Sequence, residues 1–486
     1  MEIIQQFVIT FIEKISKTAF IDGKLNVDDL SGEAIQLSHE LAIGVIEEIY
    51  NILNQIIRED KAGRKALGLT IKEKDRPRTI ITELGEINFK YDYMWDSKEE
   101  CYAAPLFSLI GIEKNERVSG ALKAKLVSNA AFMSYAESAR TVIDSMVSRQ
   151  TVCQAIKETD VEEMADPVSE KKQCEELHIF ADEDHIKLQR AKVELESAEA
   201  AENTEKKRKG KKKNKQQMVP LVVVTEGVRE VGKNRRETIK PKKFVDKEFN
   251  TKNLWNNVSG YIAATYDLYS LKKIYVHADG GKWITTGHDI LANTIGVMDG
   301  FHIAKELTRI HNVFPDLDVR KRVRAAIKSN DLTAVMQLVQ EMFDKSTSKK
   351  ETDRAEKFWT YIRNNWESIH NRQVLDIPGS CTEGQISHTL SDRFSSRPLG
   401  WSLKGAGNLS AARVYKMNGG EITRENIKRK HKAGISYSEY ANNVFEENLK
   451  GHFDFGIFEK SLKMTDMSNP TMKAIARLGN CVGFTL

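Results

Sequence analysis

Three apolar runs in this chain each end on an aspartate, in a pattern typical of buried strands. Asp182 ends LHIFAD, Asp279 ends KKIYVHAD, and Asp299 ends NTIGVMD. A carboxylate in such a place either caps the next turn or helix, or supplies one ligand of a metal site. Two glycines follow Asp279 at once, and they leave the backbone open beside the carboxylate.

Carboxylates on neighbouring strands could bridge a pair of divalent cations. Paired metals activate a water or a 3′-hydroxyl and stabilise the leaving oxygen of a phosphodiester. Oxygen ligands of this kind suit Mg²⁺, and we expect Mn²⁺ to substitute for it. We therefore predict Asp182 and Asp279 as catalytic metal ligands. Asp184 would lie on the same strand face as Asp182 and is the alternative first ligand.

Such a site needs a third carboxylate, and Glu383 is the candidate. The run CTEGQISHTL has a helical pattern that Ser380 or Thr382 would cap, which puts Glu383 in the first turn. Glu383 is thus predicted as the third catalytic residue and metal ligand. In the simpler alternatives, Glu383 only interacts favourably with the helix dipole and Asp279 only forms a turn.

The order of the predicted elements would bring these acids together. Strand patterns at 177–182, 185–195 and 218–228 precede a helix at 249–271 and strands at 272–279 and 293–299. A β-β-β-α-β-α order is the layout of an RNase H-like sheet, in which the first and fourth strands are neighbours. Asp182 and Asp279 would then lie side by side. The predicted fold class is α/β, with an RNase H-like core.

A mostly helical region that contains a β-hairpin precedes this core. Residues 1–65 have helical periodicity, and RTIITELGEINFKYDYMWD alternates on either side of a turn at LGE. The segment 134–158 has the shape of a helix-turn-helix, with Ser148 as the cap of its second helix. The outward residues that we predict to contact DNA are Arg149, Gln150, Gln154 and Lys157. An ordinary helical hairpin with a solvated face would have the same pattern.

Two further segments carry cations suited to DNA. The lysine-rich stretch EKKRKGKKKNK at 205–215, with Lys211 and Lys212, is either a phosphate-binding arm or a solvated hairpin tip. Downstream of Glu383, a basic and aromatic strip suits contacts to the DNA backbone and stacking; its members are Arg393, Arg397, Trp401 and Lys404.

The composition argues against several other classes of protein. The chain has 486 residues, of which 40% are hydrophobic and 29% charged, and its net charge of +5 weakly favours a polyanionic partner. The five cysteines have no CxxC-type spacing, which argues against a disulfide framework and a structural zinc site. No apolar run reaches the 18 residues of a membrane span, and the amphipathic N-terminus lacks the basic region of a signal peptide.

Four motifs, ADEDH, HADGGKWI, MDGFHIAK and CTEGQISHTLSDRFSSRPLGWS, occur in this order. Together they resemble the ISLre2 family of bacterial insertion-sequence transposases, also catalogued as an uncharacterised UPF0236 family. They are similar, more distantly, to the Mutator-like DDE transposases. The likeness runs from about residue 70 to residue 415.

The resemblance implies an RNase H-like core with Asp182, Asp279 and Glu383 as the DDE triad. It also implies that Asp299 and His302 belong to the D/CxxH motif of the Mutator-like group. His302 and His185 are both predicted to orient other groups or to pack in the core. The resemblance further implies that residues from about 311 to 376 form an all-helical insertion.

These patterns divide the chain into seven segments. They are a helical region at 1–70, a DNA-binding region at 71–160, a linker at 161–176, the first part of the core at 177–310, the helical insertion at 311–376, the second part of the core at 377–415, and a tail at 416–486.

The resemblance implies a DNA transposase that binds the terminal inverted repeats of its element and carries out metal-dependent strand cleavage and transfer into target DNA. We expect a homodimer or larger assembly, because two ends must be held together. We also expect it to be cytoplasmic and nucleoid-associated in a bacterium. Two alternatives stay open: a catalytically inactive or domesticated DNA-binding protein, and a stand-alone RNase H-like nuclease.

Overall fold

The computed structural model describes residues 2–20, 22–23, 26–142, 147–161, 170–189, 216–232, 235–375, 377, 379–397, 399–428, 437, 439–440 and 443. Contacts divide the chain into two compact units. Unit 1 comprises residues 1–126, 135–158 and 423–486, and unit 2 comprises residues 127–134 and 159–422. This division differs from the predicted one, because residues 1–70 share a unit with the following region and the predicted tail is split at residue 422.

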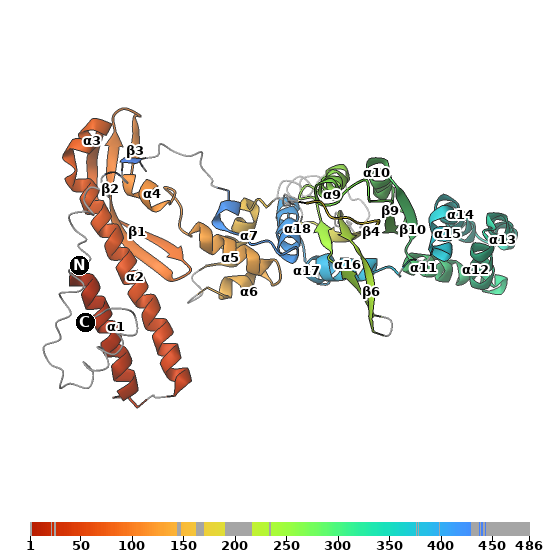
Figure 1. Cartoon of the computed structure of the whole chain (residues 1–486), viewed down its shortest axis with the longest axis horizontal. Helices are drawn as coiled ribbons and strands as arrows, with labels where there is room; N and C mark the ends of the chain where they lie inside the picture. The colour runs from red at the N-terminus through yellow and green to blue at the C-terminus, as the bar shows by residue number, and fades with distance from the viewer. Residues whose placement is uncertain are drawn as a thin grey trace, which may run out of the picture. The chain divides into compact units, whose positions relative to one another are not determined.

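Unit 1 combines helices with a three-stranded antiparallel sheet of order β1-β2-β3 (Figure 1). Its elements are α1 (Glu2–Phe20), α2 (Val27–Glu59), α3 (Lys61–Leu67), β1 (Leu69–Thr82), β2 (Gly85–Asp96), β3 (Cys101–Ala103), α4 (Pro105–Ile110), most of α5 (Gly120–Ala130), α6 (Tyr135–Arg140) and α7 (Arg149–Glu158). The alternating run forms the β1–β2 hairpin, and its turn lies between Thr82 and Gly85. Ile87, Phe89 and Tyr91 are buried in one hydrophobic cluster with Ile80 because they alternate along the strand.

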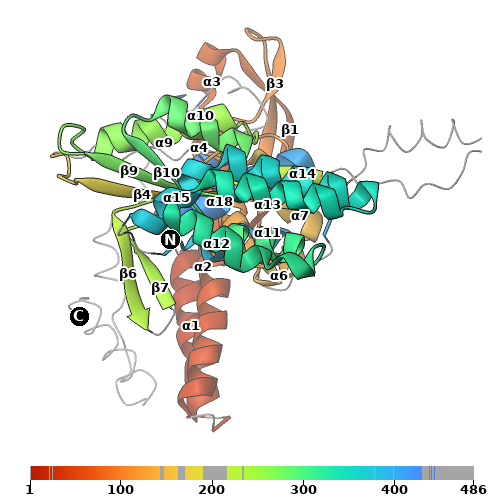
Figure 2. The same ribbon diagram turned by 90° about the vertical axis from the view of Figure 1, so that its right-hand side faces the viewer.

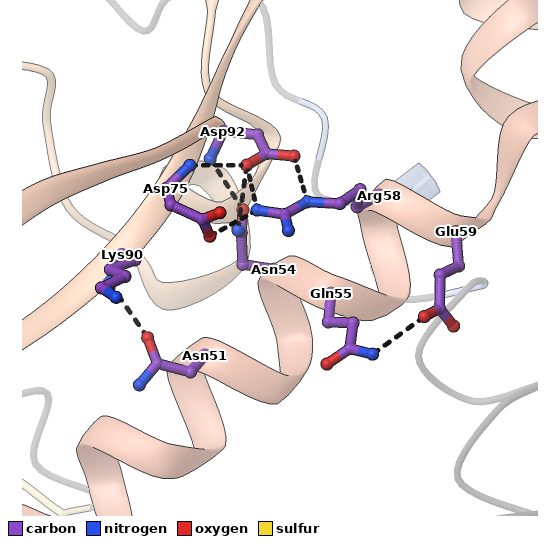
Figure 3. Close-up of polar contacts among 8 residues, drawn as sticks. All are labelled: Asn51, Asn54, Gln55, Arg58, Glu59, Asp75, Lys90 and Asp92. Carbon is purple, nitrogen blue, oxygen red and sulfur yellow. Dashed lines mark hydrogen bonds and ion pairs between the residues drawn. The ribbon is translucent and has the colours of Figure 1, made fainter. Parts of the chain in front are cut away.

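Helix α2 binds the edge of β2 through polar side chains. Asn51 and Asn54 accept hydrogen bonds from the backbone N–H groups of Lys90 and Asp92, at 3.0 and 2.8 Å (Figure 3). Glu47 accepts one from the N–H of Asn88, at 2.5 Å. The spacing of the acceptors along α2 matches the spacing of the free N–H groups along β2, because one turn of a helix advances about 5–6 Å and two strand residues advance about 6–7 Å. The helix thus takes the place of a further strand where β3, which pairs only with residues 94–96, does not reach.

Unit 2 contains a five-stranded mixed sheet of order β10-β9-β4-β5-β8. Its first elements are β4 (Glu176–Lys187), β5 (Gln216–Thr225), β6 (Gly227–Gly232), β7 (Arg235–Ile239), β8 (Lys242–Phe244), α9 (Thr251–Thr265), β9 (Lys273–Ala278), α10 (Lys282–Ile290), β10 (Thr294–Met298) and α11 (Gly300–His311). Strand β9 is parallel to β4 and to β10, whereas β5 is antiparallel to β4 and β8. Strands β6 and β7 leave the sheet as a separate hairpin (Figures 1 and 2).

One face of this sheet is covered by α9 and α10 (Figure 2). Alternate residues of the central strands, such as Ile179 of β4 and Val276 of β9, pack there against Trp255 of α9 and Ile284 of α10. Side chains one position further along each strand point to the other face. That second face therefore carries the polar residues of β4 and β9.

The predicted strands at 177–182 and 185–195 are not separate, so this expectation was wrong. A single strand, β4, runs from Glu176 to Lys187 and contains Asp182 in its interior. Antiparallel pairing with β5 continues without a break from His178 to Lys187, which carries the backbone straight through the acidic stretch. Residues 190–195 lie outside the described part of the chain.

Helices follow β10 and pack around their own hydrophobic cluster, which includes Met298, Ile310, Val323, Met342 and Phe358. They are α12 (Val319–Ser329), α13 (Leu332–Lys345), α14 (Lys349–Asn364) and α15 (Trp366–Val374), after the short turn η2 (Pro315–Leu317). Helix α14 ends at Asn364 and α15 begins at Trp366, with Asn365 between them. The chain then returns to the sheet through α16 (Thr382–Ile386), the π turn η3 (Ser387–Ser391), α17 (Asp392–Phe394) and α18 (Leu403–Met417), and the short turn η4 (Arg424–Asn426) lies in unit 1. Among the described residues, no helix has both the length and the apolarity that crossing a bilayer requires.

Candidate metal centre

Asp182 and Asp279 lie next to each other on the face of the sheet opposite α9 and α10. The parallel pairing of β4 and β9 ends with Phe180 opposite His277. Asp182 lies two residues after Phe180 within β4, and Asp279 lies two residues after His277, directly after the end of β9, so both side chains project from the same face. The strand order therefore brings together two carboxylates that are almost a hundred residues apart in the sequence.

Glu383 reaches the same place from α16, which contacts β4. Ligand atoms of Asp182, Glu383 and His302 lie within 4.8 Å of one another, and so do those of Asp182, Glu183 and Asp279. Asp182 belongs to both groups and links them. Among the described residues, Asp279 and Glu383 do not share one such group, so the predicted triad meets through Asp182.

The charge of Asp182 is strongly disfavoured in this arrangement. Asp182 is only 7% exposed. This burial raises the pKa of its carboxyl to about 7, and the nearby negative charges of Asp279, Glu183 and Glu383 raise it in the same direction. One hydrogen bond, from the N–H of Glu183 at 2.8 Å, acts in the opposite direction. A carboxylate that is buried among other carboxylates is one that a bound cation would stabilise.

Glu183 is a member of the site that the sequence reasoning missed. Its Oε2 accepts a hydrogen bond of 2.6 Å from the indole Nε1 of Trp283 in α10. The indole is held in turn by packing against Trp255, whose own Nε1 donates to the carbonyl of Trp283. The signal was present in the sequence, because Glu183 lies between the two aspartates of ADEDH and Trp283 ends the HADGGKW run.

Both carboxylate oxygens of Asp299 accept hydrogen bonds from neighbouring groups of the protein. It caps α11, with its Oδ1 accepting from the N–H of Phe301, and its Oδ2 accepts from the hydroxyl of Ser380 at 2.7 Å. This second bond ties the start of α11 to the segment that leads into α16. Ser380 or Thr382 was expected to cap that helix; the observed N-cap is Cys381, without a side-chain hydrogen bond.

The histidines and Asp184 have different positions. His302, on the first turn of α11, lies 3.9 Å from Asp182, measured from Nε2 to Oδ2. His185 is exposed and faces Glu183 at 3.8 Å. Asp184 accepts from the N–H of His185 through Oδ1 and, within the described residues, joins neither carboxylate group.

Gly280, directly after Asp279, has a φ of 89°, and a Cβ there would lie 2.2 Å from the Oδ1 of Asn365. Gly280→Ala is therefore expected to lower the free energy of unfolding of unit 2 by about 1–2 kcal/mol. Tryptophan fluorescence in denaturant measures this, and Gly260→Ala is the control. Gly260 is exposed within α9, and a Cβ added there would have nothing within 4 Å. Gly260→Ala should therefore raise the free energy of unfolding of unit 2 by about 0.5–1 kcal/mol. Equal destabilisation by both changes would contradict the argument.

Two members of the predicted DNA-binding strip are interior residues, so this part of the prediction was wrong. Trp401 is 5% exposed and donates to the carbonyl of Phe394, and Arg393 is 8% exposed and donates to the carbonyl of Ala130. Their polar ends are bound to the main chain and are not available to DNA. Arg397 and Lys404 are exposed.

The predicted helix-turn-helix corresponds to α6 and α7, which contact each other, although residues 143–146 lie outside the described part of the chain. Val152 and Ile156 are fully buried, and Ser148 Oγ accepts a hydrogen bond from the N–H of Thr151. The outward residues differ in exposure: Arg149 and Gln150 are exposed, whereas Gln154 and Lys157 are half-buried. Lys211 and Lys212 lie outside the described residues.

Comparison with known proteins shows the family. The model of the uncharacterised protein family UPF0236 matches residues 20–431. A UPF0236 protein of Caldanaerobacter subterraneus subsp. tengcongensis is 29% identical over 425 residues, which cover 87% of this chain and 85% of the relative. A second UPF0236 protein of that organism, whose name joins several loci, is 30% identical over 400 residues, covering 82% of this chain and 79% of the relative. This chain belongs to the UPF0236 family.

Proposed function

We propose that this protein is a DNA transposase of the DDE type, which binds the terminal inverted repeats of its insertion sequence and catalyses strand cleavage and strand transfer. One observation carries the proposal: carboxylates from β4, β9 and α16 converge on Asp182 at one face of a mixed sheet. Sites of this kind, built from acids on central strands and one on a helix, suit metal-dependent chemistry on phosphodiesters.

The topology of unit 2 supports an RNase H-like core. The strands met first, second and third in the sheet are β4, β5 and β8, and the two that follow α9 are β9 and β10. The spatial order then places the first strand between the second and the fourth, as the predicted layout requires. The helices α12–α15 occupy the position of the predicted insertion between the second aspartate and the glutamate.

The residues at the centre fit Mg²⁺. Their donors are carboxylate oxygens with one imidazole at the edge, and hard oxygen ligands are those that Mg²⁺ and Mn²⁺ prefer. Bound there, a pair of such ions would activate a water or a 3′-hydroxyl and stabilise the leaving oxygen. Asp182, Glu183, Asp279, Glu383 and His302 would hold them, and Asp182 is the residue common to both sets of possible ligands.

The chain's other groups would position these ligands and the substrate. Trp283 fixes Glu183, and Ser380 with Asp299 fixes the approach to α16. Gly281 keeps side-chain bulk away from Asp279, since a Cβ there would lie 3.2 Å from its Oδ1, and this would leave room for a phosphate. Positioning and neutralisation of charge are the main demands of phosphoryl transfer. These contacts would supply the positioning, and bound cations would supply the neutralisation.

A further observation favours a mobile element over a single-copy enzyme. One relative carries a single name for several loci of one genome. Repeated copies of one coding sequence are what replication of an insertion sequence would leave behind.

Asp279→Asn is expected to abolish Mg²⁺-dependent nicking of DNA that carries the element's ends, while binding of those ends is retained. The reason is that the substitution removes one charged metal ligand and leaves unit 1 unchanged. Cleavage is measured on labelled duplexes with Mg²⁺ or Mn²⁺, and binding is measured by anisotropy in EDTA. Asp289→Asn, the same change on an exposed residue of α10, is the matched control and should cleave as the wild type does.

The alternatives give other results. Specific binding without cleavage by the wild type would favour a non-catalytic DNA-binding protein. Cleavage of RNA–DNA hybrids or junctions regardless of end sequence would favour a stand-alone nuclease. Cleavage by Asp279→Asn at the wild-type rate would remove the proposed centre from the reaction.

A further inference from the structure

A basic groove lies beside the carboxylate centre in unit 2. It is a cavity of about 680 Å³ between α11, α12 and α15, and residues of β7 and of the segment at 377 and 379 also line it. Four cationic side chains line it, and no aspartate or glutamate among the described residues does; the cations are Arg236, Arg324, Lys328 and Arg372. We call this set the basic groove.

The basic groove and the centre share helix α11. Gly300 and Ile303 of α11 line the groove, and His302 between them lies 3.9 Å from Asp182. At the other side, Gly379 lines the groove, and the next residue, Ser380, is hydrogen-bonded to Asp299. A polyanion that occupies the groove would therefore lie against the helix that carries His302 and against the segment that leads into α16.

The guanidinium groups of two of these cations lie directly against glycines. A Cβ at Gly300 would lie 2.8 Å from the Nη2 of Arg372, and one at Gly379 would lie 2.1 Å from the Nη1 of Arg236. Any side chain at these positions would displace a guanidinium. The glycines thus hold two planar, bidentate donors at the wall of the groove, and such donors match phosphate oxygens.

Most of the groove's charge is not neutralised by the protein. Arg324, Lys328 and Arg372 form no ion pair with any described residue, and Arg236 has only the exposed Glu230 at 3.3 Å. Two other arginines of the same helices do form ion pairs: Arg322 of α12 with Glu341, and Arg309 of α11 with Glu306. Unpaired like charges around one cavity destabilise the free protein and are relieved by a polyanionic ligand.

We propose that the basic groove binds backbone phosphates of the DNA strand that is cleaved. These phosphates would adjoin the one at the cleavage site, and the groove would so guide that strand into the carboxylate centre. The inference rests on the proposed function and names where unit 2 holds its substrate. A strand of DNA fits better than a single phosphate, because the cations come from separate elements around a volume that exceeds one phosphate group.

Removal of two groove cations should weaken DNA binding in a salt-dependent way. The variant is Arg324→Gln with Lys328→Gln, in the full chain, on exposed positions of α12 where glutamine keeps helix propensity. The matched control is Lys350→Gln with Lys357→Gln, which makes the same change of charge on exposed positions of α14, outside the groove. Both proteins are compared with the wild type by anisotropy on an end-containing duplex, in EDTA, across a salt series.

The groove variant is expected to lose roughly tenfold affinity or more at about 0.1 M salt, and its slope of log K against log salt should fall by about 1 per lost contact. The control should keep the wild-type slope. Equal slopes for all three proteins would overturn the groove assignment, and so would equal losses in the variant and the control. These binding measurements need no cleavage, so they test the groove separately from the proposed centre. If Asp279→Asn loses nicking and the groove variant keeps the wild-type salt slope, the proposed function stands and only the groove assignment is wrong.

Discussion

The substitution Asp182→Asn is expected to abolish metal-dependent DNA cleavage and, at the same time, to stabilise the metal-free protein above pH 7. Both effects come from one property of Asp182, which is buried among Asp279, Glu183 and Glu383. Asp182 belongs both to the ligand set that contains Glu383 and to the one that contains Asp279. Loss of its carboxylate should therefore lower cleavage by at least roughly a thousandfold.

The gain in stability follows from the raised pKa. Asp182 titrates near 7 in the folded protein and near its ordinary value of 3.8 when unfolded. Between these values the folded state holds the proton that the unfolded state has lost, so stability falls as the pH rises from about 4 to 7. At pH 8 the ionised carboxylate costs up to about 4 kcal/mol, from a shift of roughly three pKa units. The asparagine variant would remove that cost above pH 7 and change little at pH 4.

Unfolding in denaturant with EDTA, at pH 8 and at pH 4.5, measures the effect through tryptophan fluorescence. The signal reports mainly unit 2, because Trp95 is the only one of the six tryptophans that lies in unit 1. Asp289→Asn should leave stability unchanged at both pH values. Mg²⁺ should stabilise the wild type and not Asp182→Asn, since a ligand stabilises only the state that binds it. A loss of stability at pH 8 in Asp182→Asn would contradict the electrostatic argument.

The neighbouring positions of Asp182 and Asp279 could be predicted because they depend on strand order and on the two-residue period of a strand. Both are readable from the pattern of apolar and polar residues. The continuity of β4 through ADED could not be read, since three acids in five residues are more typical of a turn than of a strand. Pairing with β5, whose residues lie more than thirty positions away, decides the matter.

Side chains whose roles depend on distant partners were also beyond the sequence. Arg393 and Trp401 have the composition of a DNA-binding strip, but their donors face carbonyls in the interior, one of them at Ala130. Glu183 gains its position from Trp283, a hundred residues later. The C-terminal region could not be assigned because a contact that holds it, the hydrogen bond from Tyr437 to Asp96 of β2, joins residues that are 341 positions apart.

Asp92→Asn is expected to destabilise unit 1 by about 3 kcal/mol, the second large effect. The side chain of Asp92 is fully buried on β2, where α2 meets the hairpin (Figure 3). Arg58 of α2 donates to it twice, at 2.8 and 2.6 Å, and the N–H of Asp75 and the amide of Asn54 donate at 3.1 and 3.3 Å. Removal of the charge would leave a largely buried guanidinium without its main partner.

Asp75→Asn is the matched control. Asp75 binds the same guanidinium at 2.6 Å, but its side chain is 50% exposed (Figure 3). Asparagine also tolerates the positive φ of 55° at this position. An exposed pair contributes at most about 1 kcal/mol, so the same chemical change should have a small effect here.

Hydrogen exchange of peptides from α2 and β2 measures the stability of unit 1 apart from that of unit 2. The amides of Lys90 and Asp92, which bind Asn51 and Asn54, should exchange roughly 100-fold faster in Asp92→Asn and nearly as in the wild type in Asp75→Asn. Similar rates in the two variants would show that the buried pair does not hold the helix to the hairpin.

The pH dependence of this difference distinguishes a charge effect from a packing effect. Burial alone would raise the pKa of Asp92, but the hydrogen bonds from Arg58, Asp75 and Asn54 outweigh it and hold the pKa below its ordinary value. The stabilisation is therefore complete above about pH 4 and is lost as the pH falls through the lowered value. The gap between wild type and Asp92→Asn should narrow in that acidic range, whereas a defect of packing would persist at every pH.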